Sequence, residues 1–196
     1  MRPEAATLRL AVLPRTGLLT DVLLVVAGAG LIAASAQLTI SLPFTPVPIT
    51  GQTFSVLLVG ASLGTARGGS SALLYVLVGI AGAPVYAQSD AGWDVIVGAS
   101  GGYLVSYPIV AALTGWLAEQ RWDRRLSSAI GAMLTGNVII YLVGLPWLAV
   151  VVNSDLKRTL ELGLYPFIPG DTLKLYLAAA LLPAAWKLVE RTRPRE

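Results

Sequence analysis

Long apolar stretches separated by short polar segments dominate this chain. Four stretches approach the length of a membrane-crossing helix, about 20 residues: 18–38, 103–117 with an extension at its start, 129–152 and 173–189. Two shorter apolar stretches, 53–66 and 71–83, are separated by the Arg-Gly-Gly-Ser segment 67–70. They form either one interrupted span or two short helices. We expect two helices, which gives an all-α membrane protein with six transmembrane helices.

The positions of the basic residues favour six helices over five. With a cytoplasmic N-terminus, six helices place 11 of the 14 basic residues on the cytoplasmic side: Arg2, Arg9, Arg15, Arg67, Arg121, Arg124, Arg125, Lys187, Arg191, Arg193 and Arg195. Lys157, Arg158 and Lys174 fall outside, so the chain follows the positive-inside rule. A single span over 53–83 would put the basic turn 121–125 opposite the N-terminal arginines. We therefore predict that residues 1–196 form one transmembrane domain with both termini in the cytoplasm.

Composition agrees with this pattern. The chain is 55% hydrophobic and 13% charged, about half the charged fraction of soluble domains. Its net charge of +3 comes from residues that flank apolar spans, so we expect the lipid bilayer and not nucleic acid as its surroundings. Cysteine and histidine are absent, which removes disulfides, thiolate chemistry and the commonest metal ligand. We expect no metal, no cofactor and no cleaved signal peptide.

Three long connections fall on the outer side in this topology: 39–51, 84–102 and 153–170. Long irregular segments are uncommon in compact domains unless they are functional or disordered. These segments are rich in prolines and aromatic residues, which argues against disorder. We interpret them as loops that cap an outward-facing ligand pocket.

The strongest candidate for chemistry is the pair Asp171 and Lys174 at the start of the last span. Charged side chains at such positions are expensive and are therefore functional candidates. Residues three apart share one face of a helix, so the pair suits a ligand with hydrogen-bond donors at one end and an anion at the other. The structural alternative is that Asp171 caps the helix and Lys174 neutralises it or extends to the membrane interface.

Other polar residues lie near the predicted helix ends and within the fifth span. Gln52 at the mouth of the second helix can both donate to and accept from a ligand. Asn137 and Tyr141, four residues apart, face one way and serve either a ligand or an interhelical hydrogen bond. Gly101 and Gly102 open the fourth helix, where they form an anion-binding nest or permit close packing.

Small residues four apart occur on the first helix at Ala29 and Ala33. Such spacing lets two helices approach closely. The pair therefore serves either packing within the bundle or docking of a second membrane protein.

Four segments, in this order, resemble the BioY family: Val-Pro-Ile-Thr-Gly-Gln at 47–52, Gly-Ala-Pro-Val-Tyr at 82–86, Ser-Gly-Gly-Tyr at 100–103 and Phe-Ile-Pro-Gly-Asp-x-x-Lys at 167–174. BioY proteins are the biotin-specific S components of energy-coupling factor (ECF) transporters, and the resemblance covers most of the chain. It implies six helices, a biotin pocket near the outer surface and residence in the cytoplasmic (plasma) membrane. It also implies partnership with a membrane coupling protein and two cytoplasmic ATPases, which consume ATP.

The resemblance also implies roles for individual residues. Asp171 would receive the N–H groups of the biotin ureido ring, and Lys174 would pair with the valerate carboxylate. The resemblance also places Gln52, Gln88 and Asp90 at positions that face the pocket. The other residues that we expect to bind substrate are Tyr86, Gly101, Gly102, Tyr103, Asn137 and Tyr141. Ala29 and Ala33 would form the interface with the coupling protein.

We therefore expect a non-enzymatic protein that binds biotin and enables its uptake. The alternatives are an S component for another vitamin and a solitary oligomeric biotin carrier without ATPases. A third is an intramembrane enzyme that pairs Asp90 or Asp94 with Asp171. The enzyme is disfavoured because a chain without histidine and cysteine has few general bases near neutral pH.

Overall fold

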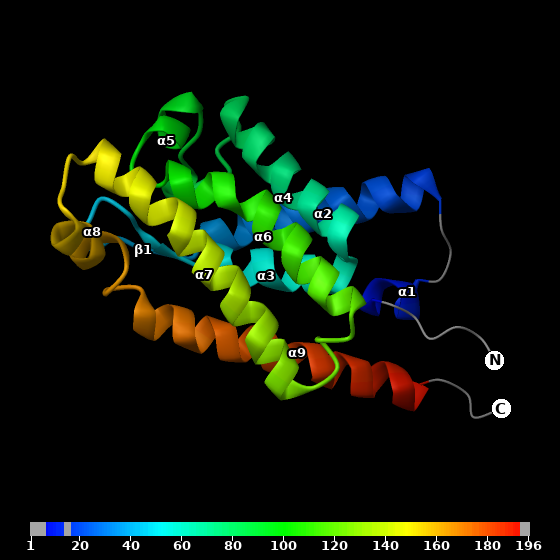
Figure 1. The fold of residues 1–196 in the computed structure, drawn as a ribbon. Helices are drawn as coiled ribbons and strands as arrows, with labels where there is room; N and C mark the ends of the chain where they lie inside the picture. The colour runs from blue at the N-terminus through cyan, green and yellow to red at the C-terminus, as the bar shows by residue number, and fades with distance from the viewer. Residues whose placement is uncertain (1–6, 14–16, 193–196) are drawn as a thin grey trace.

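Helices make up nearly all of the regular structure in the computed structural model, which describes residues 7–13 and 17–192 (Figure 1). The helices are α1 (Leu8–Val12), α2 (Leu18–Ala36), α3 (Gln52–Leu63), α4 (Thr65–Ile80), α5 (Trp93–Val97), α6 (Gly101–Glu119), α7 (Leu126–Val151), α8 (Leu156–Gly163) and α9 (Ile168–Thr192). A 3-10 turn, η1 (Ala87–Ser89), precedes α5. The strands β1 (Thr39–Ile40) and β2 (Ile49–Thr50) pair antiparallel, with Thr39 opposite Thr50.

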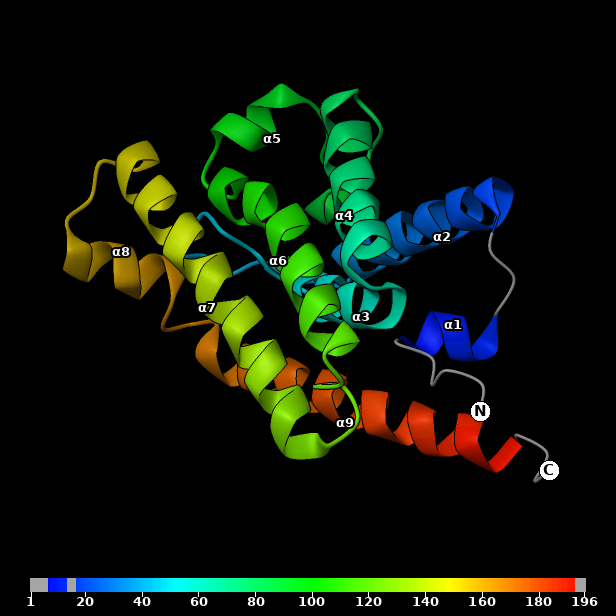
Figure 2. The same ribbon diagram turned by 45° about the vertical axis from the view of Figure 1, so that its right-hand side comes forward.

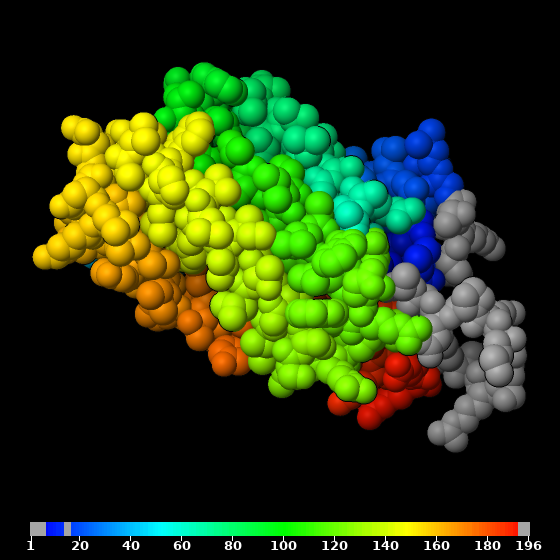
Figure 3. All heavy atoms as spheres, viewed as in Figure 1, coloured from blue at the N-terminus to red at the C-terminus, as the bar shows by residue number. Residues whose placement is uncertain are grey.

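The molecule has two distinct ends (Figures 1 and 2). The loop end carries α5, α8 and the β1–β2 hairpin, and the terminal end carries α1 and the C-terminal part of α9. α6 contacts α3, α4 and α7, and α7 in turn contacts α9. Figure 3 shows α6 and α7 side by side across one face of the molecule. The three long predicted connections gather at the loop end, where they form the hairpin, η1 with α5, and α8.

Four described helices, α2, α6, α7 and α9, are long and apolar enough to cross a membrane. Large apolar side chains such as Leu23, Ile109 and Leu142 point outward from them. The four differ in burial: 67% of the most apolar window of α6 is buried, against 17% in α2. α6 is therefore the centre of the bundle, and α2 lies at its edge.

The stretch 53–83 forms two helices, as predicted, but the predicted position of the break is wrong. Gly64, at φ +87°, separates α3 from α4, whereas residues 67–70 lie inside α4. Glu119 fixes the new start, because its carboxylate accepts from the Thr65 amide (2.9 Å) and the Thr65 hydroxyl (2.8 Å). Gly68 serves packing, since a Cβ there would lie 2.7 Å from the Gly60 Cα.

α3 and α4 contain 12 and 16 residues. At 1.5 Å per residue they are roughly 18 and 24 Å long, shorter than a hydrocarbon core of about 30 Å. The structure therefore has four helices of spanning length among its described residues, and membrane crossing by α3 and α4 stays a prediction.

The last helix begins five residues earlier than predicted. α9 starts at Ile168, with Pro169 in its first turn, where proline costs no helical hydrogen bond. Asp171 is consequently a helical residue, and its amide donates to the Phe167 carbonyl at 2.8 Å. The alternative in which Asp171 caps this helix is wrong.

Charged side chains also tie the terminal end together. Asp21 of α2 accepts from Arg9 of α1 (2.9 Å) and, through both oxygens, from Arg67 of α4 (2.7 and 3.1 Å). In the α6–α7 turn, Asp123 accepts from the Trp186 indole of α9 at 2.5 Å. Burial raises the pKa of the Asp123 carboxyl above its usual range, against the opposing effect of that hydrogen bond.

The predicted charge asymmetry matches the two ends as far as the structure describes them. The basic residues in α1, the start of α4, the α6–α7 turn and the end of α9 lie toward the terminal end. Toward the loop end lie α8, which carries Lys157 and Arg158, and the start of α9, which carries Lys174. The remaining residues of that prediction, Arg2, Arg15, Arg193 and Arg195, fall outside the described residues.

Candidate functional site

A cavity of about 130 Å³ opens at the loop end between the hairpin, η1 and helices α3, α6, α7 and α9. Most of the predicted substrate-binding residues line it: Gln52, Tyr86, Gln88, Asp90, Tyr103, Tyr141, Asp171 and Lys174. Pro46, Val47 and Pro48 of the hairpin close one side with apolar surface. The cavity thus joins segments that are far apart in the sequence.

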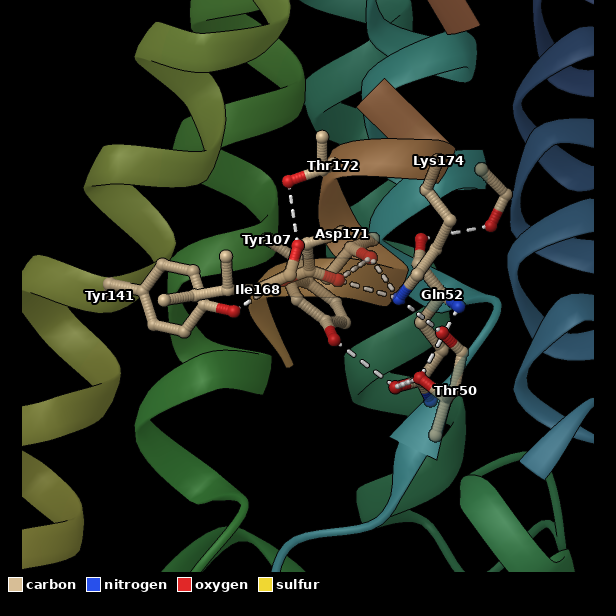
Figure 4. A network of polar contacts seen from close by, with 10 residues as sticks. Thr50, Gln52, Tyr107, Tyr141, Ile168, Asp171, Thr172 and Lys174 are labelled. Carbon is tan, nitrogen blue, oxygen red and sulfur yellow. Dashed lines mark hydrogen bonds and ion pairs between the residues drawn. The ribbon is translucent and has the colours of Figure 1, made fainter. Parts of the chain in front are cut away.

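Asp171 and Lys174 form an ion pair at the cavity wall, with 2.6 Å between the Lys174 Nζ and an Asp171 carboxylate oxygen. Lys174 also donates to the Thr50 carbonyl (2.8 Å) and the Thr53 hydroxyl (3.1 Å). Figure 4 shows the ammonium between Asp171 and the hairpin. All three donors of the ammonium can therefore be occupied by protein atoms.

The Asp171 carboxylate is held from two sides. The Tyr141 hydroxyl donates to one oxygen, and the Thr53 hydroxyl lies 3.5 Å from the other, which also accepts from Lys174. The Tyr141 ring meets Tyr103 edge to face, with 6.2 Å between centroids. A carboxylate offers about four acceptor positions, so Asp171 keeps capacity for a further donor.

Gln52 is fixed by hydrogen bonds on both ends of its amide (Figure 4). Its oxygen accepts from the Tyr107 hydroxyl and the Thr50 hydroxyl, each at 3.1 Å. Its nitrogen donates to the Tyr75 hydroxyl at 2.5 Å, which leaves one N–H of the amide for another partner. Gln52 is 4% exposed, so this network locks the side chain in one orientation at the cavity floor.

Two buried tyrosines form aromatic walls. The Tyr86 hydroxyl donates to the Val76 carbonyl at 2.6 Å, and burial raises the pKa of Tyr86 to about 12. A Cβ at Gly79 would lie 2.1 Å from the Tyr86 ring, so only glycine leaves the ring its place. The Tyr103 hydroxyl donates to the Gly163 carbonyl at 3.0 Å, which joins the wall to the end of α8.

Three predicted residues do not line the cavity: Gly101, Gly102 and Asn137. A Cβ at Gly101 would meet the Ile96 carbonyl at 1.6 Å, and one at Gly102 would meet the Trp147 Cβ at 2.4 Å. The two glycines therefore permit close packing of α6, as the structural alternative held. Asn137 is buried one turn from Tyr141, and its side-chain oxygen has no hydrogen-bond partner among the described residues.

Sequence reasoning missed Thr50, Thr53 and Tyr107 as cavity residues. Thr50 and Thr53 flank Gln52 at the start of α3, and Tyr107 follows Tyr103 by four residues on α6. Helical spacing from the recognised residues was the signal for Tyr107, because residues four apart lie on one face.

The small residues of α2 divide between two faces. Ala29 is buried within the bundle and Ala33 is half-buried, whereas Gly30 and Ala34 are exposed. Burial of Ala29 favours the packing alternative for that residue. Docking of a partner at Ala29 and Ala33 stays a prediction.

Comparison with known proteins agrees with the resemblance seen in the sequence. The sequence model of the BioY family matches residues 5–191. A biotin transporter BioY of Rhizobium etli is 33% identical over 169 residues, which cover 82% of this chain and 90% of that protein. A biotin transporter BioY of Thermotoga maritima is 38% identical over 153 residues, which cover 78% of this chain and 89% of that protein.

A solved structure has the same fold. It is a crystal structure of the S component for biotin from an ECF-type ABC transporter, with a TM-score of 0.76 and 26% identity. The match covers 86% of this chain and 92% of the solved one. Several apolar helices and this relationship make the chain a multi-pass protein of the plasma membrane. On the family match and the similarity to curated relatives, this chain belongs to the BioY family.

Proposed function

We propose that this protein binds biotin and enables its uptake as the substrate-specific S component of an ECF-type ABC transporter. One observation carries the proposal: a cavity with a buried carboxylate, an ammonium and tyrosine walls in a chain of the BioY family. Biotin presents two ureido N–H donors, an apolar sulfur-containing ring and a carboxylate tail. Each part has a chemical counterpart among the lining residues.

The recognition follows from hydrogen-bond chemistry. The Asp171 carboxylate accepts the ureido N–H groups, and the Lys174 ammonium pairs with the biotin carboxylate. Hydrogen bonds in which one group is ionised are the strong ones. Because Lys174 lies 2.6 Å from Asp171, binding both ends of biotin requires the flexible lysine side chain to leave Asp171.

The partners follow from the class of transporter. A membrane coupling protein and two ATPases on the cytoplasmic side supply the energy of uptake and consume the ATP. This chain contributes binding and no covalent chemistry. Ala29 and Ala33 are the proposed contact with the coupling protein, with the exposed Gly30 and Ala34 adjoining them on α2.

The proposed orientation has six spans, α2, α3, α4, α6, α7 and α9, with both termini in the cytoplasm. Support comes from the basic residues, most of which gather toward the terminal end among the described residues. The loop end, with the cavity, then faces outward. The biotin site would thus be loaded from outside the cell.

Calorimetry on the detergent-purified protein tests the function directly. We expect tight, near-stoichiometric biotin binding that weakens at least about 100-fold in Asp171→Asn, since losing a partner of a buried charged contact costs several kcal/mol. Asp94→Asn, an exposed aspartate near the cavity that does not line it, is the matched control. Tight binding by Asp171→Asn would remove the anchor role of Asp171.

Competition with thiamine, riboflavin and desthiobiotin separates biotin from other vitamins. Failure of the folded wild type to bind biotin, combined with binding of another vitamin, would replace the substrate but keep the transporter class. Biotin uptake by cells without any coupling protein would favour a solitary carrier.

A further inference from the structure

A strained turn forms one edge of the cavity. Residues 86–90, called here the 86–90 turn, fold back on themselves: the Tyr86 amide donates to the Asp90 carbonyl at 3.0 Å, and the Asp90 amide to the Ala87 carbonyl at 3.1 Å. Gln88 and Ser89 both have left-handed backbones, with φ values of 62° and 61°. This conformation is unfavourable for residues other than glycine, and here two such residues follow each other. Other contacts must therefore hold the turn.

The turn matters because it supplies cavity surface. Tyr86, Ala87, Gln88 and Asp90 all line the cavity. Tyr86 is anchored through its own hydroxyl to α4. Gln88 and Asp90 are exposed, so the backbone of the turn decides where their side chains stand.

Gln37, at the C-terminal end of α2, forms hydrogen bonds with two parts of this turn. Its side-chain nitrogen lies 3.0 Å from the Tyr86 carbonyl and 3.4 Å from the Val85 carbonyl. Its side-chain oxygen accepts from the Ser89 hydroxyl at 3.2 Å. One amide thus bridges the start of the turn and its second left-handed residue.

A helix-ending role alone does not explain these contacts. The Gln37 nitrogen does lie 3.3 Å from the Ala33 carbonyl of its own helix. The hydrogen bond from Ser89, however, does not stabilise the end of α2. The last carbonyls of a helix need hydrogen-bond donors, whereas Gln37 acts as an acceptor toward Ser89. Gln37 itself does not line the cavity, so it acts on a ligand only through the turn.

We propose that Gln37 is a positioning residue for the ligand site, which holds the strained 86–90 turn in the conformation that presents Gln88 and Asp90 to the cavity. The proposal rests on the proposed binding of biotin for its affinity readout. Without Gln37, the turn samples relaxed conformations, and only a fraction of the molecules keeps the conformation that binds ligand. The apparent Kd is then the intrinsic Kd divided by that fraction.

The first test compares biotin affinities. We expect Gln37→Ala to raise the biotin Kd by about tenfold, which corresponds to one molecule in ten with the turn in place. Gln37→Glu should weaken binding at least as much, since a carboxylate cannot donate to the Tyr86 carbonyl. Gln120→Ala is the matched control, because Gln120 is an exposed glutamine that follows the last residue of α6 at the terminal end.

The decisive readout is rescue by glycine. Glycine adopts positive φ about as readily as negative φ, so adding Ser89→Gly to Gln37→Ala should recover most of the lost affinity. A merely structural role of Gln37 at the end of α2 would give no rescue. Affinity in Gln37→Ala equal to that in Gln120→Ala, or a loss that Ser89→Gly leaves unchanged, would overturn the proposal.

Amide hydrogen exchange tests the same claim without any ligand. We expect faster exchange at the amides of Tyr86 and Asp90 in Gln37→Ala, with the helical core and the unfolding temperature unchanged. Unchanged exchange at both amides would overturn the proposal even if the protein binds biotin. Faster exchange in a protein that binds no biotin would support the positioning role of Gln37 and refute the proposed function. Failure of the one proposal can therefore be distinguished from failure of the other.

Discussion

The two ends of the molecule each hold a cluster of charged side chains, and the clusters differ in what surrounds them. At the loop end, Lys174 lies between Asp171, a backbone carbonyl and a hydroxyl, on the wall of a cavity. At the terminal end, Asp21 lies between two guanidinium groups, and the Arg9 side chain is only 1% exposed. No lining residue of the cavity belongs to the terminal cluster.

This difference suggests a ligand-binding role for the cluster at the loop end and a structural role for the cluster at the terminal end. Each partner of Lys174 is a group that a ligand can replace, and the lysine side chain is flexible. Asp21 instead joins three helices, and its two-point contact with Arg67 has the geometry that favours a fixed pair. Of the two clusters, only the one at the loop end adjoins the cavity, and this is why we propose a ligand role for that one alone.

Removing the ammonium at the loop end should have the largest effect. We expect Lys174→Met to raise the biotin Kd about 100-fold or more, because truncating one partner of a buried charge pair costs about 2–5 kcal/mol. Calorimetry with biotin and with biotin amide measures it, and the variant should bind the two ligands equally. Lys157→Met in α8 is the control. A variant that still prefers biotin over its amide would show that another group holds the carboxylate.

Removing the carboxylate at the terminal end should change stability instead. We expect Asp21→Asn to lower the free energy of unfolding, because the neutral amide loses its charge-assisted contacts with Arg9 and Arg67, with the biotin Kd unchanged. Denaturant unfolding in detergent and calorimetry measure the two quantities. Glu190→Gln, an exposed carboxylate on the last turns of α9, should alter neither. A large change in the Kd of Asp21→Asn would erase the distinction between the ends.

The smallest expected effect comes from the hydroxyl that supports Asp171. Tyr141→Phe removes the donor but keeps the ring against Tyr103. We expect roughly tenfold weaker biotin binding, from the loss of one hydrogen bond to a charged group. Tyr176→Phe on the outward face of α9 is the matched control. Tighter binding by Tyr141→Phe would mean that the hydroxyl competes with the ligand for Asp171.

Much of the fold could be predicted because apolar length and basic flanks are properties of the sequence itself. The α3–α4 break could not, since residues 67–70 have the composition of a loop but pack inside α4, where Gly68 touches Gly60. Glu119, which fixes the true start of α4, is 54 residues from Thr65 in the chain. Tertiary contacts decided a boundary that composition placed elsewhere.

The site shows the same limit. Asp171, Lys174 and Gln52 were predicted because each is a costly polar group near a helix end. Tyr141 was predicted from its spacing to Asn137, and the resemblance added Tyr86 and Tyr103. Gln37 was missed because it contacts Tyr86 and Ser89, which follow it by 49 and 52 positions in the chain. No local sequence pattern indicates contacts at such a distance. The roles of Gly101 and Gly102 could not be decided from the sequence, because a glycine pair looks the same in an anion-binding nest and in a tight packing contact.

The tryptophans near the two ends have an optical consequence. Trp147 donates its indole N–H to the Gly98 carbonyl in the segment between α5 and α6, and Trp186 donates to Asp123 at the opposite end. The other tryptophans, Trp93, Trp116 and Trp122, are largely exposed. A variant that keeps Trp147 as its single tryptophan would therefore report on the segment beside the cavity, and one that keeps only Trp186 would report on the opposite end.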